Sequence, residues 1–313
     1  MRTLVTGVTG FAGGHLAEAL LERGDTVVGI GRTATWPPAL QHLNGKVDLR
    51  AGDLSDAANT EAILRDTRPE RICHLAGYAR TGRSFKEADA AWDGNLTTTR
   101  RFYDAVVRWG ARPRILFIGS GLIYGGGERP PDESAPLRPA SPYAASKAAA
   151  DLLSYQVYCA PGLDVVRARP FNHIGPRQSA EFAVAHFARQ MVAIERGRQP
   201  AVLETGDLRP SRDLTDVRDT VAAYVLLLDK GRSGEAYNVA SGHDFAMQTV
   251  LDRLLKQAQL TVDVRQRTEL VRPTELAAVR ADVTKLQRET GWEPRFTLDQ
   301  TLADTLEYWR RQP

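Results

Sequence analysis

Short β-rich runs alternate with longer amphipathic runs through the first half of the chain, and this alternation restricts the fold more than any other feature. Apolar strand-like runs occupy residues 3–7, 26–31, 47–53, 71–77 and 114–120. Helix-like runs between them occupy residues 13–24, 57–67 and 95–110. Short buried strands joined by crossover helices form a parallel sheet with helices on both faces. The pattern therefore predicts an α/β fold with a doubly wound parallel sheet.

The rhythm changes near residue 170, after the run LDVVRARP, to Pro- and Arg-rich loops with scattered helices. This shift predicts a smaller lobe built mainly from the carboxyl-terminal part of the chain. We expect a Rossmann-type, dinucleotide-binding domain in residues 1–168 plus roughly 214–240. A substrate-binding domain would occupy roughly residues 169–213 plus 241–313.

The overall composition excludes several classes of partner. The 313 residues include 41 basic and 38 acidic side chains, a formal net charge of +3, which predicts neither nucleic-acid binding nor a polybasic membrane anchor. No apolar segment reaches the length of a membrane span, so we expect a cytoplasmic protein. The two cysteines, Cys73 and Cys159, have no metal-type partners nearby and are interpreted as reduced packing residues, and no metal site is expected.

The segment TGVTGFAGGHL follows the first expected strand and opens the first expected helix. Its glycines, Gly7, Gly10 and Gly13, enclose Phe11 and Ala12. Bare backbone N–H groups at a helix amino terminus favour a pyrophosphate, and glycine permits close approach of the ligand. The segment predicts a dinucleotide site, although a tight strand-to-helix turn would have the same composition.

The residue that meets the adenosine ribose in such folds follows the second strand, where this chain has Arg32. An acidic residue there would repel a 2′-phosphate, whereas a guanidinium donates charged hydrogen bonds to it. We therefore expect NADP(H) rather than NAD(H). The alternative is that Arg32 is an ordinary solvated arginine.

A possible catalytic set combines Ser120 with Tyr143 and Lys147. Ser120 stands between two glycines at the end of an expected strand, where it could simply form a turn or could present its hydroxyl to a ligand. Tyr143 and Lys147 are four residues apart in SPYAASK and share one face of a helix. A neighbouring ammonium is expected to lower the pKa of the Tyr143 phenol toward neutrality.

Taken together, these motifs resemble the extended short-chain dehydrogenases/reductases of the NAD-dependent epimerase/dehydratase family, which act on nucleotide sugars. The similarity also covers the segments GDL, HLAG, RPFNHIGP, RDLTDVRD, RPTE and TGWEP. It implies that Lys147 also holds the nicotinamide ribose and that Asn95 supports a proton-relay water. The cofactor residues implied by the resemblance, in addition to the glycine-rich segment, Arg32, Tyr143 and Lys147, are Asp53, Leu54, Ala76, Gly77 and Asn95. Asp53 could instead cap a helix, and Ala76 could merely pack.

The segment FNHIGPRQS resembles that of bacterial GDP-4-keto-6-deoxy-mannose reductases and GDP-mannose 4,6-dehydratases. By that resemblance, Asn172 and Arg177 approach the nucleotide, and Arg212 and Arg272 neutralise its diphosphate or hold its ribose. Each arginine could instead be a surface ion-pair partner. The full set of substrate residues that we expect is Ser84, Asn172, Arg177, Arg212, Arg272 and Glu275.

Dehydratases of this family carry an acid two residues after the active-site serine or threonine, where this chain has Leu122. Because loss of water needs both a proton donor and a base, dehydration is not expected, and the glycines beside Ser120 would leave space for a sugar ring. The resemblance favours NADPH-dependent reduction of GDP-4-keto-6-deoxy-D-mannose to GDP-D-rhamnose. A nucleotide-sugar 4-epimerase remains the main alternative, ahead of a 4,6-dehydratase and a non-catalytic NADP sensor. A homodimer through helices 95–109 and 141–158 is expected.

Overall fold

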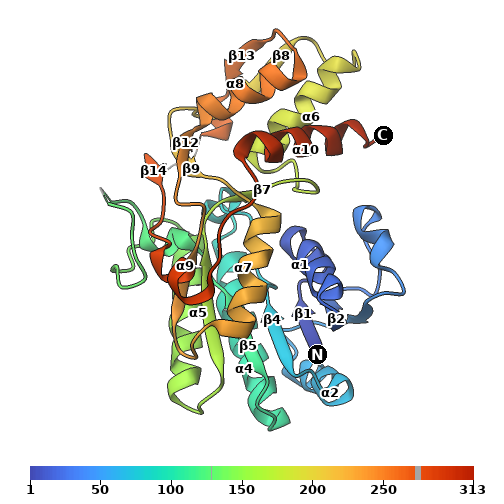
Figure 1. Cartoon of the computed structure of the whole chain (residues 1–313), viewed down its shortest axis with the longest axis vertical. Coiled ribbons are helices and arrows are strands. Elements are labelled where there is room, and N and C mark those ends of the chain that lie inside the picture. The colour runs from blue at the N-terminus through green and yellow to red at the C-terminus, as the bar shows by residue number, and fades with distance from the viewer. Residues whose placement is uncertain (128, 272–275) are drawn as a thin grey trace.

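A computed structural model of the chain describes residues 1–127, 129–271 and 276–313. Its main feature in these residues is a seven-stranded sheet with the strand order β11-β6-β5-β4-β1-β2-β3, in which every pairing is parallel (Figure 1). The prediction of a doubly wound sheet is confirmed. The strands are β1 (Arg2–Thr6), β2 (Thr26–Gly31), β3 (Asp48–Ala51), β4 (Arg71–His74), β5 (Arg114–Ile118), β6 (Val165–Pro170) and β11 (Ala236–Val239).

The strand order changes direction at β1, which lies between β2 and β4. Ligands of open parallel sheets bind at such a switch point, outside the carboxyl ends of the strands. Strand β4 ends at His74, three residues earlier than the expected run 71–77. Ala76 and Gly77 therefore belong to the loop at this edge.

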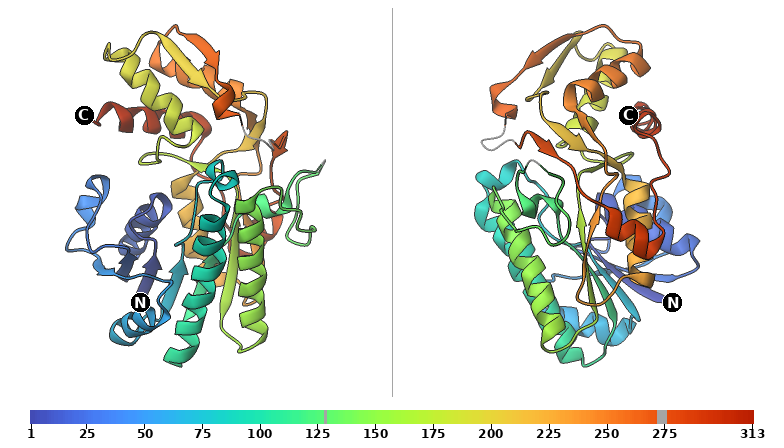
Figure 2. Two further views of the ribbon diagram at one scale, coloured as in Figure 1. Left: turned by 180° about the vertical axis from the view of Figure 1, so that it is seen from behind. Right: turned by 60° about the vertical axis from the view of Figure 1, so that its left-hand side comes forward.

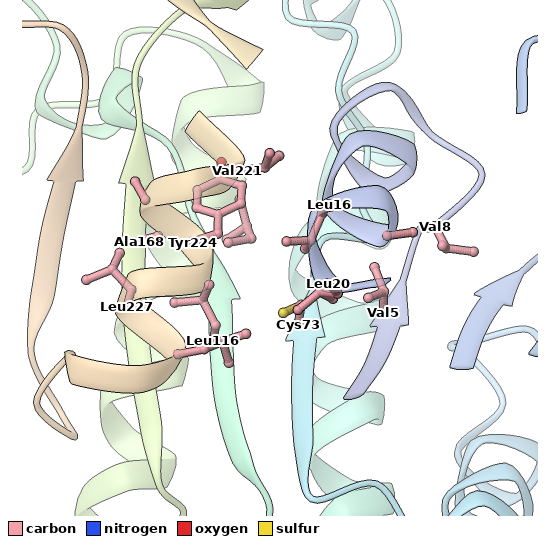
Figure 3. Close-up of a cluster of buried hydrophobic side chains, with 14 of the residues drawn as sticks. Val5, Val8, Leu16, Leu20, Cys73, Leu116, Ala168, Val221, Tyr224 and Leu227 are labelled. Atoms are coloured by element: carbon pink, nitrogen blue, oxygen red, sulfur yellow. The ribbon is translucent and has the colours of Figure 1, made fainter. Parts of the chain in front are cut away.

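Helices cover both faces of the sheet, and each face has its own apolar core. The first core joins β1 to α1 and α7 through buried residues such as Val5, Leu16, Leu20, Tyr224 and Leu227 (Figure 3). The second core lies under the helices of the opposite face, where α4 runs beside α5 (Figure 2). The first face carries α1 (Phe11–Glu22) and α7 (Val217–Lys230), and the second carries α2 (Ala57–Thr67), α4 (Thr98–Trp109) and α5 (Pro142–Cys159).

The helix expected over residues 95–110 is interrupted near its start. A short helix α3 (Ala88–Trp92) is followed by a π-helical turn, Asp93–Thr97, and only then by α4. Single π turns widen a helix locally and are frequent at functional sites. Asn95 lies within this turn and is almost completely buried.

The second lobe sits beyond the carboxyl edge of the sheet (Figure 1). Its core joins three helices, α6 (Ala183–Glu195), α8 (Met247–Ala258) and α10 (Leu298–Arg310). Helix α9 (Thr284–Thr290), which the sequence division assigned to this lobe, instead contacts α7 and β11, with Leu286 in the first core. The short strands pair as β8 (Val202–Thr205) with β13 (Asp263–Gln266), β9 (Ser211–Asp213) with β12 (Asp244–Ala246) and β14 (Ala278–Val279), and β7 (His173–Ile174) with β10 (Thr215–Asp216).

Both cysteines are free thiols. Cys73 is buried in the first core, but Cys159 at the end of α5 is exposed, so its interpretation as a packing residue is wrong. In the parts of the chain that the structure describes, every helix is too short or too polar to cross a bilayer.

Candidate active site

The glycine-rich segment forms a turn too tight for side chains. A Cβ on Gly13 would lie 2.1 Å from the carbonyl oxygen of Gly7, and Gly7 itself has a φ of +71°. Gly10 is the N-cap of α1 and supplies no side-chain hydrogen bond to the helix. The first N–H groups of α1 are therefore left without a side-chain cap, in the arrangement that suits a pyrophosphate.

A buried polar chain connects this turn to the end of β4. The Thr6 hydroxyl accepts from the backbone N–H of Ala76 at 3.1 Å and lies 2.9 Å from Nδ1 of His74. The other ring nitrogen of His74 is 3.1 Å from the Thr99 hydroxyl. Burial and the nearby Lys147 charge lower the pKa of His74 to about 3, so the ring is neutral. His74 was not predicted as a site residue, although it belongs to the HLAG segment.

Ser120 and Tyr143 come together at the end of β5. Ser120 is the N-cap of the short turn Gly121–Tyr124, and its Oγ accepts from the Leu122 N–H at 3.2 Å. The Ser120 hydroxyl also shares a hydrogen bond with the Tyr143 phenol, and both side chains are buried. Tyr143 is held in the first turn of α5, which begins at Pro142.

Lys147 lies one helical turn after Tyr143 and is also buried. Its Nζ donates to the carbonyl oxygen of Ile118 at 2.9 Å, two residues before Ser120 on the same chain segment. Burial lowers the Lys147 pKa to about 8. For Tyr143, burial raises the pKa, and the hydrogen bond with Ser120 offsets part of that rise. The expected shift of the phenol pKa toward neutrality is wrong for this structure, because desolvation of the phenol outweighs the stabilising contacts of its anion.

Gly77 and Asn95 surround the Lys147 ammonium. A Cβ on Gly77 would lie 2.6 Å from Oδ1 of Asn95 and 3.5 Å from Nζ of Lys147. Oδ1 of Asn95 accepts from the Tyr78 N–H at 3.0 Å, and its amide nitrogen donates to the Ser146 hydroxyl at 3.0 Å. The π turn thus places Asn95 between the β4 loop and α5.

The expectation that the glycines beside Ser120 leave space for a sugar ring is wrong for Gly121. A Cβ there would lie 2.3 Å from ring atoms of Phe171, so this chain's own aromatic ring fills the space. Around Gly119, the carbonyl oxygen of Ala168 would be 3.1 Å away. These glycines permit close packing of β5 against the β6 segment rather than ligand access.

The residues expected near the adenosine lie past the ends of β2 and β3. Arg32 follows β2, is exposed, and has no ion pair or hydrogen bond with any residue that the structure describes. Asp53 is exposed and accepts from the Ser55 N–H at 2.9 Å and the Ser55 hydroxyl at 2.7 Å, which lowers its pKa. Leu54 beside it is buried. The tight glycine turn, its uncapped helix and the unpaired Arg32 together fit a dinucleotide with a 2′-phosphate.

Of the expected substrate residues, Asn172 shows the clearest sign of a missing partner. It follows β6, and its buried Oδ1 has no hydrogen-bond partner among the described residues. Ser84 is fully buried and donates to the carbonyl oxygen of Thr81 at 2.7 Å. Arg212 on β9 is buried and donates to the carbonyl oxygens of Ser211 and Leu276.

The other three expected substrate residues are Arg177, Arg272 and Glu275. Arg177 pairs with Glu18 on α1, with two contacts of 2.6 Å. Arg272 and Glu275 lie outside the described residues. Within those residues, His, Cys, Asp and Glu form no group of three that could hold a metal ion.

A parallel sheet with an uncapped glycine turn at its switch point and a buried Ser, Tyr and Lys set defines an NAD(P)-dependent enzyme of the extended short-chain dehydrogenase/reductase class. The family model described as GDP-mannose 4,6 dehydratase matches residues 4–305. The chain belongs to this family, and the resemblance found in the sequence is confirmed.

Known relatives include more than one activity. The chain is 35% identical over 312 residues to the GDP-6-deoxy-D-mannose reductase of Pseudomonas aeruginosa, covering 98% of this chain and 97% of the relative. It is similar to the structure of RMD from Pseudomonas aeruginosa complexed with NADPH, at 33% identity and a TM-score of 0.84, with 99% and 98% of the two chains covered. It is also similar to the UDP-glucose 4-epimerase of Thermus thermophilus in complex with NAD, at 29% identity and a TM-score of 0.88, with 99% of each chain covered.

The low pKa of Lys147 predicts a specific pH dependence of stability. Its folded pKa of about 8 lies below the ordinary value of 10.5, so between these values the unfolded chain binds the extra proton. The free energy of unfolding should therefore gain about 1.4 kcal/mol per pH unit from this group as pH rises through that window. The free energy of unfolding would be measured in urea for wild type and Lys147→Met at pH 7.5 and pH 10. The difference between the two proteins isolates the contribution of Lys147, because all other titrating groups are common to both. If the free energy of unfolding changed equally with pH in both proteins, Lys147 would have the same pKa in the folded and unfolded chains, contrary to the prediction.

Proposed function

We propose that this protein is an NADPH-dependent reductase of a nucleotide-linked 4-keto-6-deoxy sugar, with GDP-4-keto-6-deoxy-D-mannose as substrate and GDP-D-rhamnose as product. The Pseudomonas aeruginosa reductase supports the substrate class. The observation that carries the reaction type is the buried pair of Tyr143 and Ser120, with Leu122 where a dehydratase has an acid.

The bound cofactor supplies the hydride that reduces the keto carbon. The hydroxyls of Ser120 and Tyr143 hydrogen-bond the keto oxygen and polarise the carbonyl. As negative charge develops on that oxygen, Tyr143 gives up its phenolic proton to form the product hydroxyl. Lys147 provides a buried positive charge that stabilises the phenolate left behind, and it holds the nicotinamide ribose.

A protonated Tyr143 suits this direction of reaction. A reductase needs a phenol that is still protonated when substrate arrives, and burial keeps the proton on at neutral pH. An epimerase or dehydratase begins by oxidising the sugar, for which the phenolate is the required form. Leu122 is packed at the edge of an apolar cluster and has no group that could expel water.

Arg32 supports NADP(H) over NAD(H), because its guanidinium is exposed and unpaired among the described residues. The relative solved with NADPH is consistent with this choice, whereas the epimerase relative was solved with NAD. Oxidised NAD held by the purified protein would support the epimerase alternative.

We propose that the protein forms a homodimer and that α4 and α5 of the two subunits make the interface. Large apolar side chains are exposed there, with 44% of Val107, 57% of Leu152 and 47% of Tyr155 accessible. Exposed large apolar side chains on two neighbouring helices are a feature of protein interfaces.

Arg32 provides the test of the cofactor. Wild-type protein should bind NADPH at least about tenfold more tightly than NADH, since charge-assisted hydrogen bonds each contribute roughly 1.5–3 kcal/mol. Arg32→Ala should remove most of this preference by weakening NADPH alone, measured by fluorescence titration. Arg265→Ala, which changes an exposed arginine of the second lobe, should keep the wild-type ratio. Equal affinities for the two cofactors in wild type would rule out the assignment.

The reaction itself can be tested with two substrates. Supplied with GDP-4-keto-6-deoxy-D-mannose, the protein should consume NADPH stoichiometrically with the sugar. Supplied with GDP-mannose and NADP⁺, it should form no 4-keto-6-deoxy sugar, because Leu122 cannot supply the acid-base chemistry that loss of water needs. Tyr143→Phe removes only the hydroxyl and should lower the turnover about 10² to 10⁴-fold while NADPH binding persists.

Formation of the keto sugar from GDP-mannose would contradict the argument from Leu122. Turnover of another nucleotide's keto sugar, with none of the GDP form, would correct the nucleotide and keep the reductase. Interconversion of stereoisomers without net loss of NADPH would identify an epimerase instead.

Leu152→Glu tests the homodimer. A charge at the centre of an apolar interface is costly, so the variant should elute as a monomer where wild type elutes as a dimer in size-exclusion chromatography with light scattering. Val264→Glu, at an exposed site on β13, should leave the dimer intact. A monomeric wild type would refute the proposed surface.

A further inference from the structure

The segment that follows β6 is fastened to helix α1 by Arg177. The two terminal nitrogens of Arg177 donate to the two carboxylate oxygens of Glu18, each at 2.6 Å. Nη2 of Arg177 also lies 2.6 Å from Nδ1 of His15, whose Nε2 lies 3.0 Å from the carbonyl oxygen of Pro176. The Arg177 and Glu18 side chains are only 14% and 27% exposed, so water competes weakly with this bidentate pair.

The backbone of Arg177 adopts a conformation that few side chains allow. Its φ is 75°, in the left-handed region that non-glycine residues rarely occupy. Such a conformation persists only where surrounding contacts hold it. Glu18 and His15 on α1 supply side-chain contacts of Arg177, whereas His173 and Ile174 of the same segment are held separately by the pairing of β7 with β10.

A ring contact joins the same two segments closer to the ligand sites. His173 stacks on Phe11, with ring centroids 5.8 Å apart and an interplanar angle of 11°. Phe11 is the first residue of α1 and follows the N-cap Gly10. Asn172, with its unpartnered Oδ1, directly precedes His173. The contact between Phe11 and His173 thus connects the glycine-rich turn, where we propose that the cofactor binds, to Asn172, which we propose contacts the substrate.

We propose that Arg177 is a positioning residue that couples cofactor binding to nucleotide-sugar binding, and that it is not itself a ligand of the substrate diphosphate. Ordering of the α1 amino terminus by the cofactor restricts the segment from Asn172 to Gln178 further, through Glu18, His15 and Phe11, in addition to the pairing of β7 with β10. Binding of a nucleotide to the same loop then costs less ordering, so each ligand raises the affinity for the other. This inference rests on the proposed function only for the identity of the nucleotide.

Glu18 separates the positioning role from a direct one. If Arg177 contacted the diphosphate, Glu18→Gln would release its guanidinium, and nucleotide affinity would stay the same or rise. If Arg177 acts through α1, Glu18→Gln should have the same effect as Arg177→Met. The double variant should then be no worse than either single one.

Amide hydrogen exchange measures the coupling without any substrate. Addition of NADPH should slow exchange across residues 172–178 in wild type. This protection should be lost in Arg177→Met and in Glu18→Gln, while residues 7–14 stay protected by NADPH in every variant. Arg310→Met, which breaks a comparable pair with Glu195 in the second lobe, should behave as wild type. Protection of residues 172–178 that survives in both variants would overturn the proposal.

Titration with GDP supplies the second measurement. NADPH should tighten GDP binding by about tenfold in wild type and by less than about twofold in Arg177→Met and Glu18→Gln, within the usual range of coupling between sites. A large loss of GDP affinity in Arg177→Met without NADPH, absent from Glu18→Gln, would identify Arg177 as a direct ligand. Failure of GDP to bind wild type would refute the nucleotide assignment, and the exchange measurement would still decide the role of Arg177. Thermal unfolding of each variant checks that it is folded.

Discussion

A buried ammonium is the constraint around which the active site is arranged. Lys147 lies within the protein, where a positive charge is costly unless it is hydrogen-bonded. The carbonyl oxygen of Ile118 provides the acceptor, so the end of β5 and the first turns of α5 are held in one geometry. That geometry places Tyr143 against Ser120. On the other side of the ammonium, the absence of a side chain on Gly77 makes room for the Asn95 side chain, which the π turn supplies.

The same buried environment surrounds Tyr143. Desolvation raises the pKa of its phenol above the ordinary value, so the phenol carries its proton at neutral pH and can act as a donor. A donor beside the keto oxygen suits reduction, and Leu122 leaves the site without the second acid-base group that dehydration needs. Proteins similar to this chain include dehydratases and epimerases with the same fold. The proposed reductase is therefore supported by Tyr143 and Leu122 and not by the fold.

Much of the fold could be read from the sequence because it depends on local patterns. Apolar runs and crossover helices predicted the sheet, and the spacing of Tyr143 and Lys147 predicted one helical face. The π turn at Asn95 could not be predicted, because a single inserted residue leaves the helical pattern almost unchanged. The Phe171 ring beside Gly121 and the pairing of Arg177 with Glu18 join residues far apart in the chain. No local pattern in the sequence indicates such contacts. The sequence therefore predicts space for a sugar at Gly121 and a nucleotide contact at Arg177.

The transfer of hydride to carbon 4 of the sugar is the central claim, and isotope labelling tests it most directly. NADPH carrying deuterium at the transferred position would be incubated with GDP-4-keto-6-deoxy-D-mannose and the wild-type protein. The account predicts a 6-deoxy sugar with one deuterium at carbon 4, in an amount equal to the NADPH oxidised. A product without deuterium at that carbon, or stereoisomers formed while NADPH is unchanged, would contradict it.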